Sequence, residues 1–298
     1  MLNFDELIGK YLQSIIEENK SSLTIRNYKH YLSRFSDFIK AHFPIMTPAT
    51  LNSEIITKYN QYLREFRDLK GNYLDKRTCA YHLIALRSFV KYLRSKNMNT
   101  INPEEINVPK GQSKPLKFLD NNQIEMLLRL AENKRDKCIL ELILATGLRV
   151  SDLVRIDKSD INFQAKTISF NVKGNSRSIF LSQKALYWLE QYMKDRSDDS
   201  SALFIRTAGR KDSTLRLNVR SVQRIVEKYV KKANLPIKAT PHTLRHTFAI
   251  NLLSEGINLP VVQRILNHKN ISTTQIYTHV TNPQLKEIHR KFHGKTSQ

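Results

Sequence analysis

The 298-residue chain is long enough for two domains and too long for a small module held together by disulfides. Its formal charge of +22 favours a nucleic-acid partner over a merely basic or ribosome-associated protein. Two cysteines, Cys79 and Cys138, are too few for a disulfide framework or a cysteine-rich zinc site. The sequence has no secretory signal and no apolar run long enough to cross a bilayer, so we expect a cytoplasmic protein.

Apolar residues recur at helical spacing through the first hundred residues. These stripes predict helices over 4–16, 28–39, 55–63 and 83–93. The tyrosines in the stripes favour a packed core over a platform for base stacking, because aromatic side chains at this spacing usually face inward. The fourth helix also carries basic side chains that are candidate DNA contacts: Arg77, Arg87 and Lys91.

Helical periodicity stops between Asn99 and Leu119, where prolines, a glycine and several lysines interrupt the chain. Proline disfavours helix at the residue before it, so this composition is typical of a linker between domains. The sequence therefore predicts an N-terminal helical domain over 1–99, a linker over 100–118 and a C-terminal domain over 119–298.

The C-terminal domain is expected to be mixed α+β. Apolar residues alternate over 168–172, ahead of a Gly174–Asn175 turn and a return strand through 179–181. This pattern predicts a small antiparallel sheet. Because helices are predicted over most of the remaining sequence, the whole chain is expected to be mainly α. More than one helix is predicted within 120–146. Further helices are predicted in the following ranges: 183–195, 217–234, 240–255, 258–267 and 272–280.

Two helix starts carry side chains suited to binding an anion. In "ATGLRVSDL", Gly147 is placed to end one helix, so that Arg149 and Asp152 fall on the opening turn of the next. The free N–H groups and the positive end of the helix dipole favour an anion beside Arg149. The alternative is a surface ion pair between Arg149 and Asp152.

The second helix start lies in "TPHTLRHTFAI". Thr240 can cap a helix and Pro241 suits its first position, so that His242, Arg245 and His246 share one face of the opening turns. His242 and His246 also have the one-turn spacing of a metal-binding pair. No acidic ligand or HExxH glutamate accompanies them, so His246 is interpreted as a packing or supporting residue and no metal is expected.

Three further residues are candidates for chemistry. Lys173 is expected at the hairpin tip, either as a mobile cation or simply as an exposed lysine. Asn267 can take the left-handed conformation that ends a helix, which would leave His268 just beyond it. Ser272–Gln275 has capping-box spacing, so Tyr277 is expected in the second turn of a new helix, unless it is merely a buried tyrosine.

Six of these residues follow an order that resembles the tyrosine site-specific recombinases, also called the phage-integrase family and here closest to its Xer branch: Arg149, Lys173, His242, Arg245, His268 and Tyr277. The resemblance covers nearly the whole chain and includes "LIALRSFVKYL" in the N-terminal domain. The family usually has Gly where Asn267 stands and often has Glu where Asp152 stands. Both replacements preserve the expected physical role.

The resemblance implies a SAM-like core-binding domain followed by a catalytic domain that cleaves and rejoins DNA through a 3′-phosphotyrosine. Tyr277 would be the nucleophile, and Arg149 and Arg245 would clamp the phosphate with paired donors. His242 would accept the tyrosine proton, while His268 would donate to a phosphate oxygen. Lys173 would be the general acid. Asp152 would support the segment that carries Arg149.

The expected partner is double-stranded DNA with paired half-sites, on which four protomers, identical or shared with a paralogue, bring two sites together. The phosphotyrosine ester conserves the energy of the broken bond, so neither ATP nor a metal cofactor is expected, and the sequence has no GxxxxGK[ST] motif. Chromosome or plasmid dimer resolution and mobile-element integration or excision are both compatible with the sequence. The alternatives are a non-catalytic DNA-binding regulator, a type IB topoisomerase and an HxxxH metalloenzyme.

Overall fold

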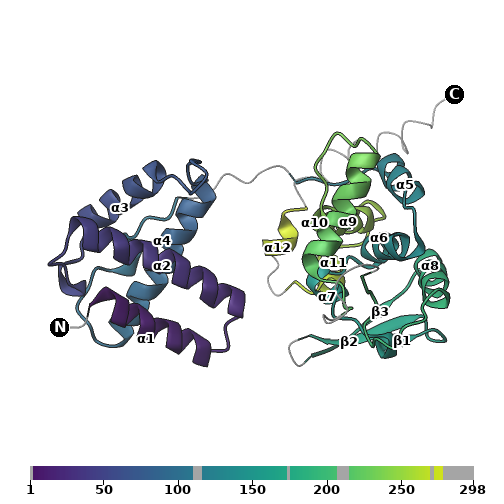
Figure 1. Ribbon diagram of the computed structural model, residues 1–298, viewed down its shortest axis with the longest axis horizontal. Coiled ribbons are helices and arrows are strands. Elements are labelled where there is room, and N and C mark those ends of the chain that lie inside the picture. The colour runs from purple at the N-terminus through teal and green to yellow at the C-terminus, as the bar shows by residue number, and fades with distance from the viewer. Residues whose placement is uncertain (1–2, 110–115, 173–174, 207–214, 269–271, 278–298) are drawn as a thin grey trace. The chain divides into compact units, whose positions relative to one another are not determined.

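The chain forms two compact units in the computed structural model, Met1–Lys114 and Pro115–Gln298 (Figure 1). Each unit has its own core of buried apolar side chains. None of the helices in the described part of the chain is long and apolar enough to cross a membrane. The structure describes the following residues: 3–109, 116–172, 175–206, 215–268 and 272–277.

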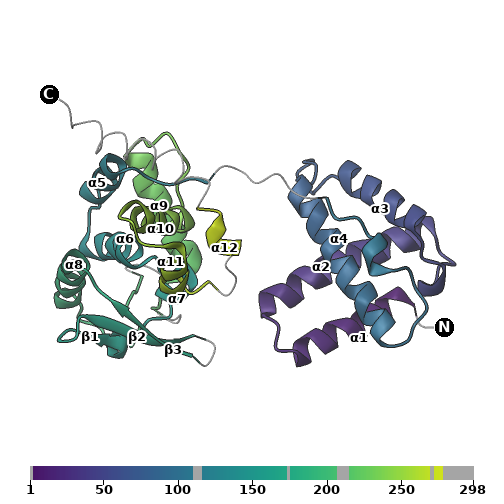
Figure 2. The ribbon, with the colours of Figure 1, turned by 180° about the vertical axis from the view of Figure 1, so that it is seen from behind.

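The described part of the N-terminal unit forms four α-helices, as predicted. In Figures 1 and 2 these helices surround a common core, in which α2 packs against α1 and α4, and α3 packs against α4. A polar side chain caps the first turn of each helix, and Tyr11 and Tyr59 are buried rather than displayed for stacking. The helices span these residues: α1 Phe4–Glu17, α2 Ser22–His42, α3 Ser53–Glu65 and α4 Lys76–Ser95.

Part of the segment predicted as a linker packs onto this first core. Ile101 and Ile106 are buried in it, on either side of a short 3₁₀ turn, η2 (Pro103–Glu105). The Arg87 guanidinium donates to the carbonyl of Ile106, and Lys91 lies 3.7 Å from a carboxylate oxygen of Glu104. Apolar burial therefore extends the N-terminal unit beyond the end of the helical periodicity, at least to Ile106.

The C-terminal unit places a three-stranded antiparallel sheet beside a set of helices (Figures 1 and 2). Strands β2 and β3 pair with Ile168 opposite Ile179, and β1 is a two-residue edge strand that is too short to show alternation in sequence. Helix α6 is buried on most of its faces and packs against α8 and α10. The elements span these residues: α5 Asn121–Arg129, α6 Lys134–Thr146, α7 Val150–Leu153, β1 Ile161–Asn162, β2 Thr167–Val172, β3 Asn175–Phe180, α8 Gln183–Lys194, α9 Val219–Lys232, α10 Pro241–Ser254, α11 Leu259–Leu266 and α12 Ser272–Gln275.

Left-handed residues end two helices, α6 and α11, whose C-terminal ends lie close together. Gly147 ends α6 with a φ of 61°, and Asn267 ends α11 with a φ of 51°, as the sequence predicts for residues that take the left-handed conformation. A Cβ atom on Gly147 would lie 2.3 Å from a ring carbon of Phe248 and 2.9 Å from a methyl carbon of Leu266. The chain after α6 can therefore lie against α10 and α11 only because residue 147 has no side chain.

We expect Gly147→Ala to lower the free energy of unfolding by about 2–4 kcal/mol, from left-handed strain together with overpacking. Gly256→Ala is the matched control, since Gly256 also has a positive φ, 84°, but a Cβ there would meet no atom within 4 Å. Urea denaturation of both variants measures the difference. Equal losses in the two variants would show that the contact with Phe248 and Leu266 is relieved at little cost.

Candidate active site

The second turn of α10 presents Arg245 to the centre of the C-terminal unit. Thr240 caps the helix, its hydroxyl accepting from the Thr243 N–H, and Pro241 occupies the first position, as predicted. This register turns Arg245 inward, where it is only 3% exposed, while His242 on the previous turn is exposed. The predicted helix start is confirmed, with Arg245 as its buried cation.

Arg245 links its own helix, α10, to the chain at the end of α6 and to the chain at the end of α11 through its two terminal nitrogens. Nη1 donates to the carbonyl of Gly147 at the end of α6, and Nη2 donates to the carbonyl of Leu266 at the end of α11, at 2.6 Å. Nη2 also lies 2.9 Å from Nε2 of His268. The carbonyls at a helix C-terminus lack helical partners, so the guanidinium both satisfies them and is oriented by them.

Arg149 reaches the same place from the N-terminal end of α7. Its Nη2 donates to the carbonyl of Asn267 at 3.1 Å, one residue before His268. Burial and the charge of Arg149 lower the pKa of Arg245 to about 10, which leaves Arg245 protonated near neutral pH. Two guanidinium groups therefore lie close enough to influence each other, and an anion beside them would relieve their repulsion.

Asp152 does not pair with Arg149, which was the alternative considered from the sequence. Its Oδ2 lies 4.0 Å from Nη1 of Arg177, a residue of β3 that also donates to the carbonyl of Ile265 at 2.6 Å. Sequence reasoning missed Arg177. The strand alternation carried the signal, because Arg177 and Ile179 are partly buried between exposed neighbours at 176, 178 and 180.

His268 and Tyr277 are joined through Thr274. The Thr274 hydroxyl lies 2.9 Å from Nδ1 of His268, and the Thr274 carbonyl accepts from the Tyr277 N–H at 3.0 Å. The sequence analysis expected Tyr277 in the second turn of a helix that starts near Ser272. That expectation was wrong, because α12 ends at Gln275 and Tyr277 lies in the turn after it. The side chain is fully buried against α10 and α11, and a phosphate can reach its hydroxyl only after local rearrangement.

His246 contacts the Tyr277 hydroxyl directly. Its Nδ1 lies 2.8 Å from the phenolic oxygen, and the two rings meet edge to face with centroids 5.5 Å apart. His242 stacks on the other side of this network, its ring centroid 6.5 Å from that of His246. The sequence suggested packing or support for His246 and gave no sign of contact with Tyr277, because α10 and α12 are far apart in the chain.

Burial sets the protonation of this cluster. Desolvation, followed by nearby positive groups, lowers the pKa of His246 and of His268 to about 4, and lowers that of His242 as well. Burial raises the pKa of Tyr277, although Arg245 and Arg149 act in the opposite direction. Near neutral pH the imidazoles are therefore uncharged, the phenol is protonated and the arginines carry the positive charge.

This pattern makes folding stability depend on pH. The folded-state pKa of His246 and His268 lies below the unfolded value, so the unfolded chain binds more protons between about pH 4 and 6.5. We expect the free energy of unfolding to fall by about 2–3 kcal/mol in total from pH 7 to pH 4.5, after discounting for the partial exposure of both rings. Urea denaturation across this range measures the loss, and the double variant His246→Asn/His268→Asn should show a shallower slope. An unchanged slope would contradict the assignment to these two rings.

Lys173 lies outside the described residues, so the structure does not place it. The other five residues of the predicted set come together around Arg245, and Asp152 lies beside them through Arg177. Of the three candidate DNA contacts in the N-terminal unit, Arg77 is exposed, while Arg87 and Lys91 have partners in the segment after α4. No group of three or more His, Cys, Asp or Glu side chains within the described ranges is arranged to hold a metal ion.

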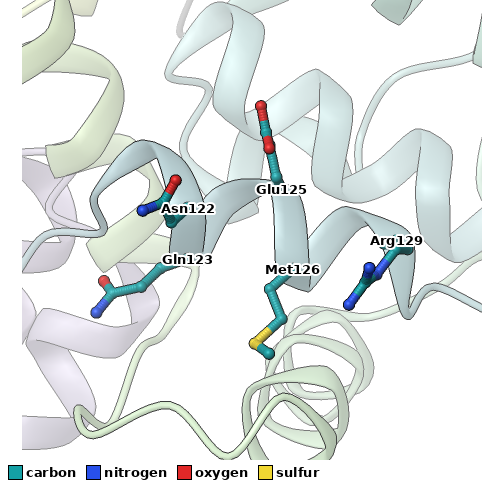
Figure 3. Close-up of a pocket in the computed structure, with 5 residues that line it drawn as sticks. All are labelled: Asn122, Gln123, Glu125, Met126 and Arg129. Atoms are coloured by element: carbon teal, nitrogen blue, oxygen red, sulfur yellow. The ribbon is translucent and has the colours of Figure 1, made fainter.

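A pocket on α5 is separate from this cluster. Figure 3 shows its lining, in which Glu125 points away from Met126 and Arg129. None of the candidate catalytic residues lines it. The candidate active site is therefore defined by the side chains that converge at the C-terminal ends of α6 and α11 and in the first two turns of α10.

Residues 117–283 match the Phage integrase family, and residues 8–97 match the N-terminal SAM-like domain of phage integrases. The chain belongs to the phage integrase family. Among curated proteins, the chain is 35% identical to the tyrosine recombinase XerC of Thermodesulfovibrio yellowstonii, over 98% of each chain. It is also 35% identical to the tyrosine recombinase XerA of Pyrococcus horikoshii, over 96% of this chain and 93% of that protein. This family member is therefore an enzyme of the tyrosine recombinase class, as its sequence predicted.

Solved structures have the same fold. The chain is 25% identical in sequence to a XerA recombinase whose crystal structure is known. The similarity covers 98% of this chain and 99% of that chain, with a TM-score of 0.54. A Tn1549 transposon integrase in complex with transposon right end DNA gives a TM-score of 0.74 at 19% identity, covering 97% and 99% of the two chains. These similarities confirm the predicted fold class, a mainly α chain with a SAM-like domain and a catalytic domain that holds a small antiparallel sheet.

Proposed function

We propose that this integrase is a site-specific DNA recombinase that cleaves and rejoins strands through a 3′-phosphotyrosine intermediate. The observation that carries the proposal is the convergence of Arg149, Arg245 and His268 with the phenol of Tyr277. Contacts run from Arg245 through His268 and Thr274 to Tyr277, and His246, the residue after Arg245, contacts the phenol oxygen, so Arg245 lies near the oxygen that would attack. A polyanionic substrate also agrees with the net charge of +22.

The arginines would stabilise the transition state of phosphoryl transfer. Negative charge accumulates on the non-bridging oxygens of the phosphate, and the guanidinium donors of Arg149 and Arg245 can contact them without losing protons. Thr274 and Arg245 hold the two ring nitrogens of His268, and Nε2 accepts from Arg245. His268 would donate a third hydrogen bond from Nε2 to the phosphate once this nitrogen gives up its contact with Arg245 and carries a proton. Asp152 supports this arrangement through Arg177.

The remaining steps are proton transfers. The 5′ oxygen of the broken strand must gain a proton as it leaves, and Lys173 is the proposed general acid. The sequence assigned the tyrosine proton to His242, and this residue is proposed to contact the phosphate from the exposed face of α10. The reaction conserves the phosphodiester energy in the phosphotyrosine, so neither ATP nor a metal cofactor enters the proposal.

The proposed partner is double-stranded DNA with paired half-sites. Arg77, Arg87 and Lys91 are proposed phosphate contacts of the N-terminal unit, and a tetramer of this chain, alone or with a paralogue, would bring two sites together. The biological role is proposed to be either dimer resolution of chromosomes or plasmids, or integration or excision of a mobile element. Both roles place the enzyme with DNA in the cytoplasm.

Covalent capture tests the proposal. DNA bound to the protein in its host is crosslinked to it, isolated and sequenced, and a nicked duplex of the recovered site is then incubated with purified protein. We expect a complex that survives denaturation, forms in the presence of a chelator, and yields a peptide containing phosphorylated Tyr277 after digestion. Specific binding without any covalent complex would favour the alternative, a DNA-binding regulator of the same fold.

A further inference from the structure

His246 contacts the atom that the proposed reaction uses as its nucleophile. Its Nδ1 lies 2.8 Å from Oη of Tyr277, within the range over which a proton moves between a base and a reacting group. We propose that His246 is the residue that accepts the proton of Tyr277 when the phenol attacks DNA. This inference rests on the proposed function and assigns to His246 a step that the sequence assigned to His242.

The position of His246 suits this role better than that of His242. His242 is exposed and stacks on the His246 ring, and the ring nitrogen in contact with the phenol belongs to His246. His246 also follows Arg245 directly on α10, and the capping box at Thr240 anchors the start of that helix. The acceptor and the phosphate-binding cation are therefore held by one rigid element.

The surroundings of His246 keep it uncharged until an anion arrives. The titratable and charged groups that act on it are His242 and Arg245 on its own helix, with His268 and Tyr277 facing it from the segment after α11. Burial and the neighbouring cation lower the pKa of His246 to about 4, so near neutral pH its ring has a lone pair available. A bound phosphate brings negative charge, which favours the imidazolium form and so strengthens His246 as an acceptor.

The step balances as follows. The phenol proton of Tyr277 passes to Nδ1 of His246 as the Oη lone pair forms the bond to phosphorus. The bond from phosphorus to the 5′ oxygen breaks, and that oxygen keeps the electron pair and takes a proton from the proposed general acid, Lys173. In the rejoining step the 5′ hydroxyl returns its proton to Lys173 as its oxygen attacks phosphorus. The bond from phosphorus to Oη of Tyr277 breaks, and the departing Tyr277 oxygen recovers its proton from the imidazolium of His246. No oxidant, metal or nucleotide is needed.

Two substitutions at residue 246 separate proton acceptance from positioning. His246→Asn keeps an acceptor oxygen close to the place of Nδ1 but cannot take a proton, whereas His246→Ala removes both properties. We expect both variants to form the covalent complex about 10²–10³-fold more slowly than the wild type in single turnover near neutral pH. Their rates should rise with pH, as hydroxide replaces the lost acceptor. A rate near that of the wild type for His246→Asn would overturn proton acceptance and leave a positioning role.

A substrate with sulfur in place of the 5′ bridging oxygen distinguishes the two ends of the reaction. A thiolate leaves without a proton, so this substrate should restore the rate of Lys173→Met but not that of His246→Ala. Restoration of His246→Ala would place His246 with the leaving group and overturn the proposal. His42→Asn, an exposed histidine of the N-terminal unit, is the control expected to retain the wild-type rate.

Failure of this inference is distinguishable from failure of the proposed function. If the wild type forms a covalent complex and His246→Ala matches its rate, the inference is wrong and the recombinase function stands. If the wild type forms no covalent complex with the recovered site, both are wrong. Urea denaturation of each variant at neutral pH establishes that the rates belong to folded protein.

Discussion

Tyr277→Phe is expected to abolish the covalent complex with DNA while leaving the fold and DNA binding intact. Phenylalanine keeps the ring that packs against α10 and α11 and removes only the hydroxyl, so no cavity is created. The lost hydrogen bond leaves Nδ1 of His246 without its partner, which should lower the free energy of unfolding by about 1 kcal/mol. Denaturing gels with labelled nicked DNA, together with gel shifts, measure both properties.

Tyr187→Phe is the matched control for this substitution. Tyr187 lies on α8 with 52% of its surface exposed, so the same chemical change there should leave the covalent complex and its rate unchanged. Formation of the complex by Tyr277→Phe would mean that another side chain attacks the DNA. Loss of DNA binding in the variant would instead mean that the hydroxyl supports the structure of the DNA-binding surface.

Arg245→Lys is expected to lower the cleavage rate by about 10²–10³-fold, although the positive charge is retained. Lysine is a point charge without the planar fork, so it cannot hold the carbonyls of Gly147 and Leu266 while contacting a phosphate. A carbonyl left without a donor in this buried place costs about 1–3 kcal/mol, so the free energy of unfolding should fall as well. Single-turnover cleavage and urea denaturation separate the two losses.

Arg224→Lys, on the exposed face of α9, is the control for replacing a guanidinium with an ammonium group. It should leave both the rate and the stability at wild-type values. If Arg245→Lys loses stability but cleaves normally once corrected for the folded fraction, Arg245 holds the ends of α6 and α11 together and does not act on the phosphate. If it loses rate without stability, the contacts with the two carbonyls contribute little to folding.

Local sequence signals determined the secondary structure and most of the candidate residues. The cap at Thr240 and the left-handed residues Gly147 and Asn267 act within one turn of the chain, so their effects could be predicted without tertiary contacts. The extent of the helix near Tyr277 was predicted less well. The capping-box spacing predicted a helix through Tyr277, whereas α12 ends at Gln275 and the tyrosine turns into the cluster between α10 and α11.

Contacts between distant segments belong to the tertiary structure alone. The sequence predicted Arg245 and His246 on the opening turns of a helix that starts after Thr240, but only folding brought the carbonyls of Gly147 and Leu266 to Arg245, and His246 to the hydroxyl of Tyr277. Arg177, Asp152 and Ile265 met in the same way. The physical reason is that helical periodicity records which face of an element is buried, whereas the partner across the core depends on how whole elements pack.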